Sequence, residues 1–142
     1  MPLKVIQKEI EAEREVGYRY LQVLGRAEAL VPGAGREAIE VLLWDAGATV
    51  IRADVQSDRV VLDGALNCQA VYRQGEECSL RALSAKSTLS QVAEIPGAQG
   101  GMLSQVQPVV ENVDARYENG HIVFLVSLGL HVRVMKLERS VE

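Results

Sequence analysis

Residues 59–72 read RVVLDGALNCQAVY, and apolar or small residues occupy every second position. The apolar set comprises Val60, Leu62, Gly64, Leu66, Cys68, Ala70 and Tyr72, whereas the other set includes Arg59, Asp63, Asn67 and Gln69. Alternation with a period of two predicts a β-strand that buries one face and exposes the other. The stretch holds no arrangement of groups that could break a bond, so we predict a structural role for this strand.

Other segments show the same preference for extended structure. Residues 16–24 (VGYRYLQVL) and 48–56 (ATVIRADVQ) are rich in β-forming residues and predict half-buried strands. Residues 121–135 (HIVFLVSLGLHVRVM) alternate as well, and their second face is partly apolar. This pattern predicts a strand that is central in its sheet or covered on both sides. Residues 1–15 fit an alternating strand or, by their Lys and Glu content, a helix, and both remain open.

One helix is predicted among the strands. The run REAIEVLLWDA (residues 36–46) places Ile39, Leu42 and Leu43 at helical spacing, and Gly47 stands where it could cap the end. We therefore predict a short helix over residues 36–45. The expected fold class is mainly β, an antiparallel β-sandwich or partly closed barrel with this one helix, as a single domain over residues 1–142.

Composition excludes several classes of function. Hydrophobic residues make up 48% of the chain but aromatic residues only 4%, so the core is expected to consist of Val, Leu, Ile and Ala. The net charge is -4 and basic residues are not clustered, which disfavours nucleic acid as a partner. The apolar runs are shorter than the roughly 18 residues that a membrane helix needs, and the start lacks the features of a signal peptide. We therefore expect a cytoplasmic protein that does not insert into membranes.

The two cysteines lie on either side of a predicted turn. A two-residue loop at Gln74-Gly75 would pair Val71 with Cys78 and leave Cys68 three residues out of register. A disulfide between Cys68 and Cys78 thus requires a longer loop. The alternative is two thiols in a reducing compartment.

Candidate catalytic and metal-binding residues are few. His121 and His131 would stand ~33 Å apart on one strand, too far to share a metal ion. Ser84, Ser87 and Ser90 lack the strand-turn-helix context that makes a serine nucleophilic. We predict that the protein is not an enzyme and has no catalytic residue, cofactor or metal.

Two glycine-rich segments interrupt the alternation. PGAGRE (residues 32–37) lacks the Lys-Ser/Thr of a phosphate-binding loop and is expected to be a turn. IPGAQGGM (residues 95–102) supplies the loop or interface candidates Pro96, Gly97, Gly101 and Met102. The proline ends strand pairing, the glycines permit unusual backbone angles, and the methionine can fill a gap in the core or in a partner's groove.

The chain also contains a weak internal repeat. ADVQSDRVVLDGALNCQAVYR and DARYENGHIVFLVSLGLHVRV can each be described as a short strand, a polar turn and a long alternating strand. The similarity is consistent with a duplicated hairpin and also with an ordinary β-meander, and the two explanations remain open.

The order of these motifs resembles the SPOCS domain of spore-forming bacteria. In that family a V-x-V-x-G strand running into a tyrosine precedes a P-G-A-x-x-G-M-like segment and a closing hairpin of alternating hydrophobic residues. The matching positions are Val60, Leu62, Gly64 and Tyr72, then Pro96, Gly97, Ala98, Gly101 and Met102, then Val110, Val113 and the strand from Ile122 to Val134. The leading half of the chain also resembles the family, so nearly all of it is covered.

The resemblance implies a non-catalytic structural and interaction protein of the spore envelope that acts in coat assembly during sporulation. It implies a place in the mother-cell cytoplasm at the forming spore surface, with a coat morphogenetic partner such as the ATPase SpoIVA. The alternative is a small-ligand or carbohydrate-binding β domain, for which Trp44, one Phe and four Tyr offer little stacking surface. We also expect self-association, because a strand that is apolar on both faces needs additional cover.

Overall fold

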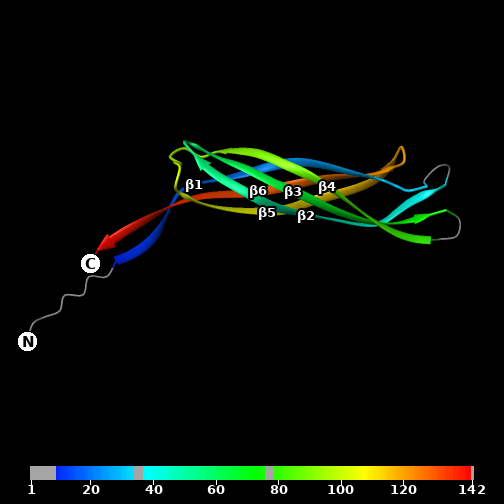
Figure 1. The fold of residues 1–142 in the computed structure, drawn as a ribbon, viewed down its shortest axis with the longest axis horizontal. Helices are drawn as coiled ribbons and strands as arrows, with labels where there is room; N and C mark the ends of the chain where they lie inside the picture. Colours follow the sequence, from blue (N-terminus) through cyan, green and yellow to red (C-terminus); the bar gives the residue numbers. More distant parts are fainter. Residues whose placement is uncertain (1–8, 34–36, 76–78, 142) are drawn as a thin grey trace, which may run out of the picture.

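The computed structural model describes residues 9–33, 37–75 and 79–141, which form six strands and two sheets (Figure 1). The strands are β1 (Glu9–Leu30), β2 (Ile39–Gln56), β3 (Arg59–Gln74), β4 (Ser79–Glu94), β5 (Leu103–Glu118) and β6 (His121–Val141). Sheet I has the order β1-β6-β5 and sheet II the order β2-β3-β4, and every pair is antiparallel. The predicted antiparallel β-sandwich is confirmed.

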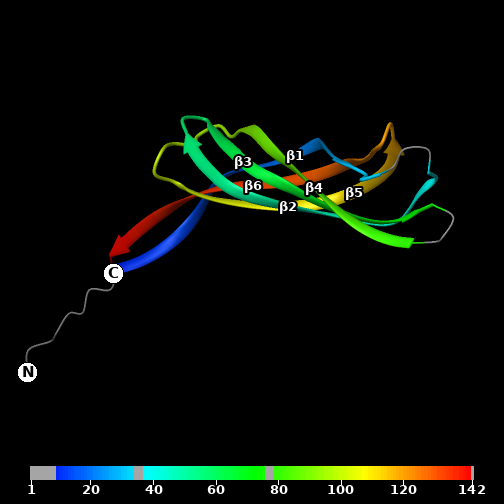
Figure 2. The same cartoon turned by 45° about the vertical axis from the view of Figure 1, so that its right-hand side comes forward.

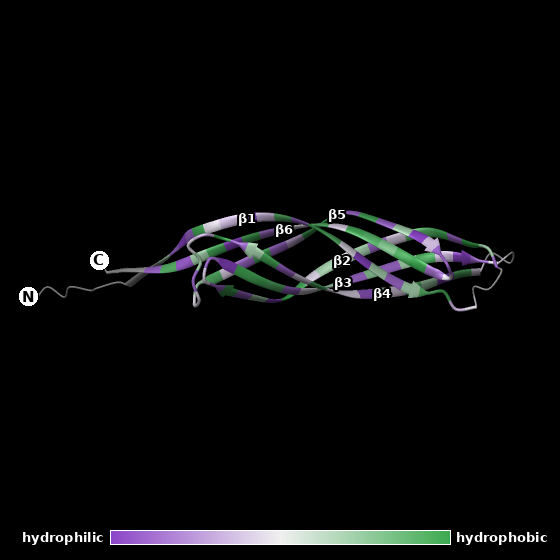
Figure 3. Ribbon diagram, turned by 90° about the horizontal axis from the view of Figure 1, so that it is seen from above, coloured by the Kyte–Doolittle hydropathy of each residue, from purple (hydrophilic) through white to green (hydrophobic). Residues whose placement is uncertain are grey.

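The two alternating strands recognised from sequence are the central strands of the two sheets. Along β3 every second residue from Val60 to Gln74 is buried, and along β6 the same holds from Ile122 to Val134. Both inner faces belong to one hydrophobic core, and hydrophobic and hydrophilic residues alternate visibly along the strands in Figure 3. A central strand forms hydrogen bonds with both of its neighbours, so β6 joins the three strands of sheet I and β3 joins those of sheet II.

The outer face of β6 is covered in part by its neighbours in sheet I. Val123 is buried although it points away from the core. Gly129 lies beneath Tyr20, whose Cε2 atom would be 2.8 Å from a Cβ atom built on this glycine. Only glycine leaves room for the tyrosine to lie flat against the strand. The cover on this side therefore comes from the chain itself.

The predicted helix over residues 36–45 is wrong for the residues that the structure describes. Residues from Ile39 onward form the first part of β2, and residue 36 lies outside the described residues. The register shifts between Val41 and Leu43, so one extra residue interrupts the alternation there. A bulge of this kind moves the following residues to the opposite faces and produces apolar spacings that imitate a helix. Gly47, expected as a cap, pairs with Asn67 instead.

Residues 9–15, left open between strand and helix, belong to β1, and residues 1–8 lie outside the described part of the chain. They pair with residues 135–141 of β6. β5 begins opposite Met135, so in the described chain the segment after Met135 pairs with β1 alone. We call residues 9–15 and 135–141 the ribbon, and Figures 1 and 2 show it leaving one end of the sandwich. No helix within the described ranges is long and apolar enough to cross a membrane.

The core predicts a large difference between two adjacent residues of β6. Phe124 is fully buried, whereas the side chain of Leu125 points to the outer face and is 48% exposed. We expect Phe124→Ala to lower the free energy of unfolding by about 3–5 kcal/mol, and Leu125→Ala by about 1 kcal/mol or less. Urea denaturation of both variants measures the difference. Equal losses would contradict the assigned orientation of β6.

Candidate functional site

The loop over residues 95–102, which contains the site residues predicted from the sequence, is hydrogen-bonded to the turn between β2 and β3. Asp58 lies in this turn with φ of 60°. Its backbone N–H donates to Ala98 O (2.8 Å), its carbonyl accepts from Ile95 N (3.0 Å), and its Oδ1 accepts from Gly97 N (2.9 Å). Aspartate tolerates the left-handed region and can accept from a nearby backbone N–H, so one residue joins two loops.

An equivalent junction joins the loop after β1 to the turn between β5 and β6. Val31 N donates to Gly120 O (2.9 Å), as Ile95 N does to Asp58 O. Both Val31 and Ile95 are buried, and each precedes the sequence Pro-Gly-Ala. The amide of Gln74 also holds the first loop by donating to the carbonyls of Pro32 and Gly33, each at 3.1 Å. The chain thus consists of two similar halves, each a strand, a Pro-Gly-Ala loop and a hairpin.

The four candidates from the sequence occupy different environments in this loop. Pro96, Gly97 and Gly101 are exposed, and both glycines have positive φ, 90° and 88°. Met102 is half-buried and packs against the core, with its N–H donating to Gln99 O. The structure therefore gives Pro96 and Gly97 a place in the junction with Asp58. Their use as an interface stays a prediction.

The loop also borders the base of the ribbon. A hollow of about 310 Å³ lies between residues 99–103 and the ribbon residues Lys136 and Leu137. Leu103 and Leu137 are both partly exposed there. Exposed apolar side chains that lie close together are a feature of surfaces that contact other proteins.

A group of aromatic side chains, the tyrosine cluster, lies on the outer face of sheet I and comprises Tyr18, Tyr20 and His131. The centroid of the His131 ring is 6.0 Å from that of Tyr18 and 5.1 Å from that of Tyr20. The Tyr18 hydroxyl is hydrogen-bonded to His131 Nδ1, and the Tyr20 hydroxyl donates to the Glu111 carboxylate. The register of β1 against β6 places Tyr20 directly opposite His131.

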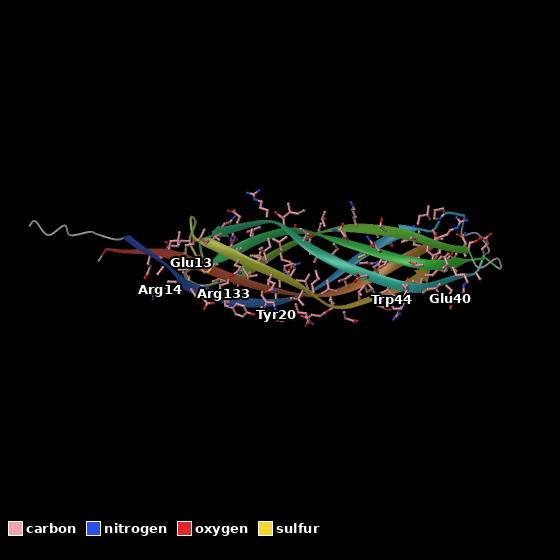
Figure 4. All side chains as sticks on the ribbon, turned by 90° about the horizontal axis from the view of Figure 1, so that it is seen from below. Glu13, Arg14, Tyr20, Glu40, Trp44 and Arg133 are labelled. Carbon is pink, nitrogen blue, oxygen red and sulfur yellow. The ribbon has the colours of Figure 1, made fainter. Side chains whose placement is uncertain are left out.

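Charged residues extend this cluster toward the ribbon. The guanidinium carbon of Arg133 is 5.6 Å from the centroid of the Tyr18 ring, and its Nε donates to Glu15 (2.9 Å). Figure 4 shows Arg133 between Tyr20 and the ribbon residues Glu13 and Arg14. A shallow hollow of about 250 Å³ lies next to the cluster and is lined by Tyr18, Gln105, Gln107, Val109, His131 and Arg133. Its lining is rich in hydrogen-bond donors and can bind a polar group.

Sheet II has a larger hollow, of about 460 Å³, across β2, β3 and the first part of β4. Its lining includes Leu43, Asp45, Val71, Ala82 and Ser84. Small side chains on β3 and β4 leave the space, and Leu43, one of the exposed leucines, borders it. At the seam between the sheets, Trp44 Nε1 donates to the carbonyl of Val113 (2.9 Å), so the single tryptophan joins β2 to β5.

The residues considered for chemistry are dispersed. His121 bonds the carbonyl of Asn119, whereas His131 belongs to the tyrosine cluster. Ser90 Oγ donates to Asp63 (2.9 Å). Among the described residues, no group of three or more His, Cys, Asp or Glu side chains could hold a metal ion.

Cys68 is a buried thiol on the inner face of β3. It pairs with Ala85 of β4, whereas Cys78 lies outside the described residues. Burial, and to a smaller extent the Asp45 carboxylate, raises the pKa of the Cys68 thiol above its ordinary value of 9.0. The thiol is therefore held in its neutral, weakly reactive form.

The sequence matches a known protein family. The family described as SipL, SPOCS domain, matches residues 37–118, which is more than half of the chain and extends from β2 to the end of β5. The chain belongs to the SPOCS-domain family. This is a spore-coat domain family that is not known to be catalytic. No curated protein sequence and no solved structure matches the chain.

Two features of this member of the SPOCS-domain family were not predicted from the sequence. The sequence predicted a polar turn at Asp58 but not its hydrogen bonds to the loop over residues 95–102. Its position before a long strand and the tolerance of aspartate for the left-handed region could have indicated this role. The tyrosine cluster could not be predicted, because it forms only when β1 and β6 pair in the observed register.

The Asp58 junction predicts a loss of stability on removal of its carboxylate. Asp58→Ala removes the acceptor for Gly97 N and places alanine at positive φ, so we expect the free energy of unfolding to fall by about 1–2 kcal/mol. Asp58→Asn keeps an acceptor and tolerates this conformation, so its loss should be about 0.5 kcal/mol. Thermal unfolding compares the two variants. Equal losses would mean that the charge, rather than the hydrogen bond, is required.

The thiol predicts a specific dependence on pH. The pKa of the Cys68 thiol is higher in the folded state than in the unfolded state. The neutral thiol therefore contributes fully to stability below the ordinary value of 9.0, and this contribution is lost as pH rises through the folded pKa. We expect the free energy of unfolding to fall more steeply above that pH in the wild type than in Cys68→Ala. Urea unfolding at several alkaline pH values measures both slopes. Parallel slopes would contradict a raised pKa.

Proposed function

We propose that the protein is a non-catalytic structural component of the spore envelope, which acts as a single domain in coat assembly during sporulation. Membership of the SPOCS-domain family carries this proposal. The geometry supports it, because the two halves interlock through the Asp58 and Val31 junctions and leave both outer sheet faces available. A firmly joined sandwich with free faces is suited to binding other proteins.

The proposed site of action is the mother-cell cytoplasm at the surface of the forming spore, with a coat morphogenetic protein of the SpoIVA kind as partner. The tyrosine cluster on sheet I is the proposed contact surface. It combines partly exposed Tyr18 and Tyr20 with Arg133, and tyrosine and arginine are enriched where protein interfaces have their strongest contacts. The loop candidates Pro96, Gly97, Gly101 and Met102 extend this surface around the end of the sandwich.

Capture from sporulating cells tests this function. The tagged protein should recover a coat morphogenetic protein, identified by mass spectrometry, and a fluorescent fusion should surround the forming spore. Tyr18→Ala should reduce the recovery several-fold, because truncating an interface tyrosine commonly costs more than about 1 kcal/mol of binding energy. Thr88→Ala, on the outer face of sheet II, is the matched control. Uniform fluorescence and no captured coat protein would overturn the proposal.

A second candidate, binding of a small ligand or carbohydrate, is favoured by the hollow beside the tyrosine cluster. Tyr18 offers a partly exposed ring, and Gln105 and Gln107 offer amides that match hydroxyl groups. Calorimetric titration with monosaccharides and short glycans tests it. Heat of binding that disappears in Tyr18→Ala supports this second function, and its absence at millimolar ligand concentrations rejects it.

A further inference from the structure

The ribbon is a strand pair without the support that the rest of the fold provides. Six residues of β1, from Glu9 to Arg14, pair with residues 136–141 of β6 beyond Met135, opposite which β5 begins. The other half of the molecule has no such extension, because β4 starts at Ser79 after a short connection from β3. Isolated two-stranded ribbons are marginally stable in water, and a third strand stabilises them. The free edge of β1 is where a third strand can be added.

Three of the four edge strands are interrupted in ways that hinder the addition of another strand. β1 has a register shift between Glu15 and Gly17, at the base of the ribbon, and β2 has two such shifts. β5 has a shift between Val110 and Asn112 and also contains Pro108, which has no N–H to donate. Bulges and prolines on edge strands prevent unwanted pairing between chains.

β4 differs from these edges. It keeps one continuous register with β3 from Ser79 to Glu94. Its last carbonyl, Glu94 O, accepts from Arg19 of β1 at 3.4 Å, whereas its first four residues are all exposed. The first half of β4 is therefore a regular edge that can accept a strand, and the hollow of sheet II at Ala82 and Ser84 lies beside it.

The charges of the two edges are complementary. Residues 79–93 contain Arg81 and Lys86 and no acidic residue, whereas residues 9–15 (EIEAERE) contain four glutamates and one arginine. Glu76 and Glu77 precede β4, so the attraction centres on Arg81 and Lys86. Arg81 lies opposite Tyr72 and Lys86 opposite Asn67 in β3, so the two cations are on opposite faces of β4, and the complementarity is one of net charge between the two edges rather than of paired side chains.

Apolar side chains are also available at both places. Leu80, at the start of β4, is 64% exposed. Leu103 and Leu137, which border the hollow at the base of the ribbon, are 42% and 46% exposed. Contact between these leucines would remove apolar surface from water on both sides and add to the attraction of the charges.

The two edges lie at opposite ends of the molecule. The ribbon is at one end of the sandwich, and the start of β4 is near the other (Figures 1 and 2). A contact between two different surfaces at opposite ends leaves one of each free in every new complex. Such a head-to-tail contact joins subunits into a filament or a ring rather than into a dimer with the same surface on both partners.

We propose that the β1 strand of the ribbon, Glu9–Glu15, adds to the first half of β4, Ser79–Lys86, in a second copy of the chain, so that copies join head to tail. The inference rests on the proposed structural function and specifies how the protein associates with itself. The added strand completes a three-stranded sheet on the ribbon. It also covers the regular first half of the β4 edge.

Charge reversal on each edge tests this contact. One variant carries Glu11→Lys and Glu13→Lys, and the other carries Arg81→Glu and Lys86→Glu. Each alone should show association weakened by about tenfold or more in sedimentation velocity, because like charges then oppose each other. An equimolar mixture should regain association, since each reversed edge then finds its complement in the other variant. Added salt should weaken assembly of the wild type.

A control variant, Arg26→Glu with Arg116→Glu, makes the same change of charge as Arg81→Glu with Lys86→Glu but on the outer face of sheet I, and it should associate like the wild type. Circular dichroism checks that every variant is folded. A wild type that stays monomeric at high micromolar concentration, or a mixture that stays monomeric, overturns the proposal. A ribbon variant that still forms dimers also overturns it and indicates pairing of β4 with β4. A monomeric protein that still captures coat proteins leaves the proposed function in place.

Discussion

The sandwich depends on burying the inner faces of β3 and β6 in one shared core. Each is the central strand of its sheet, and each contributes an unbroken series of buried residues on alternate positions. Because the chain has few aromatic residues, this core is built from many small contacts of Val, Leu, Ile and Ala with Tyr72 and Phe124 among them. The edge strands can then vary in register without loss of the core. The bulges of β1, β2 and β5 are tolerated for this reason.

The same arrangement explains what could be predicted from the sequence. β3 and β6 each carry a strict alternation over more than a dozen residues, and this signal is local, so both strands were predicted correctly. β2 was misread because the extra residue between Val41 and Leu43 shifts the alternation, and a bulge leaves no local mark that separates it from a helical spacing. Edge strands are thus the elements for which sequence patterns are least informative.

The candidate site, like the fold, could be predicted only in part from the sequence. The Pro-Gly-Ala loop was recognised from its residues, but its partner Asp58 lies 39 positions from Gly97 and was not identified. The equivalence of the two Pro-Gly-Ala segments was also missed, although both are visible in the sequence. Their common role is defined by what they contact. Val31 bonds to the β5–β6 turn and Ile95 to the β2–β3 turn, so each segment contacts the hairpin of the other half. The tyrosine cluster depends on the register between two strands that are distant in the chain, and such registers follow from the whole fold rather than from either strand.

The two halves of the protein are alike in their junctions and unlike at their ends, and this difference bears on the proposed function. If the molecule were only a closed sandwich, both halves would be expected to protect their edges in the same way. Instead, the first half lengthens its leading strand into the ribbon, while the second half begins with the regular strand β4. A lengthened, acidic edge and a regular, basic edge are unfavourable in a protein that must remain monomeric, because each can pair with a strand of another molecule. In the head-to-tail contact proposed above, the same two features would be the means by which one coat subunit engages the next.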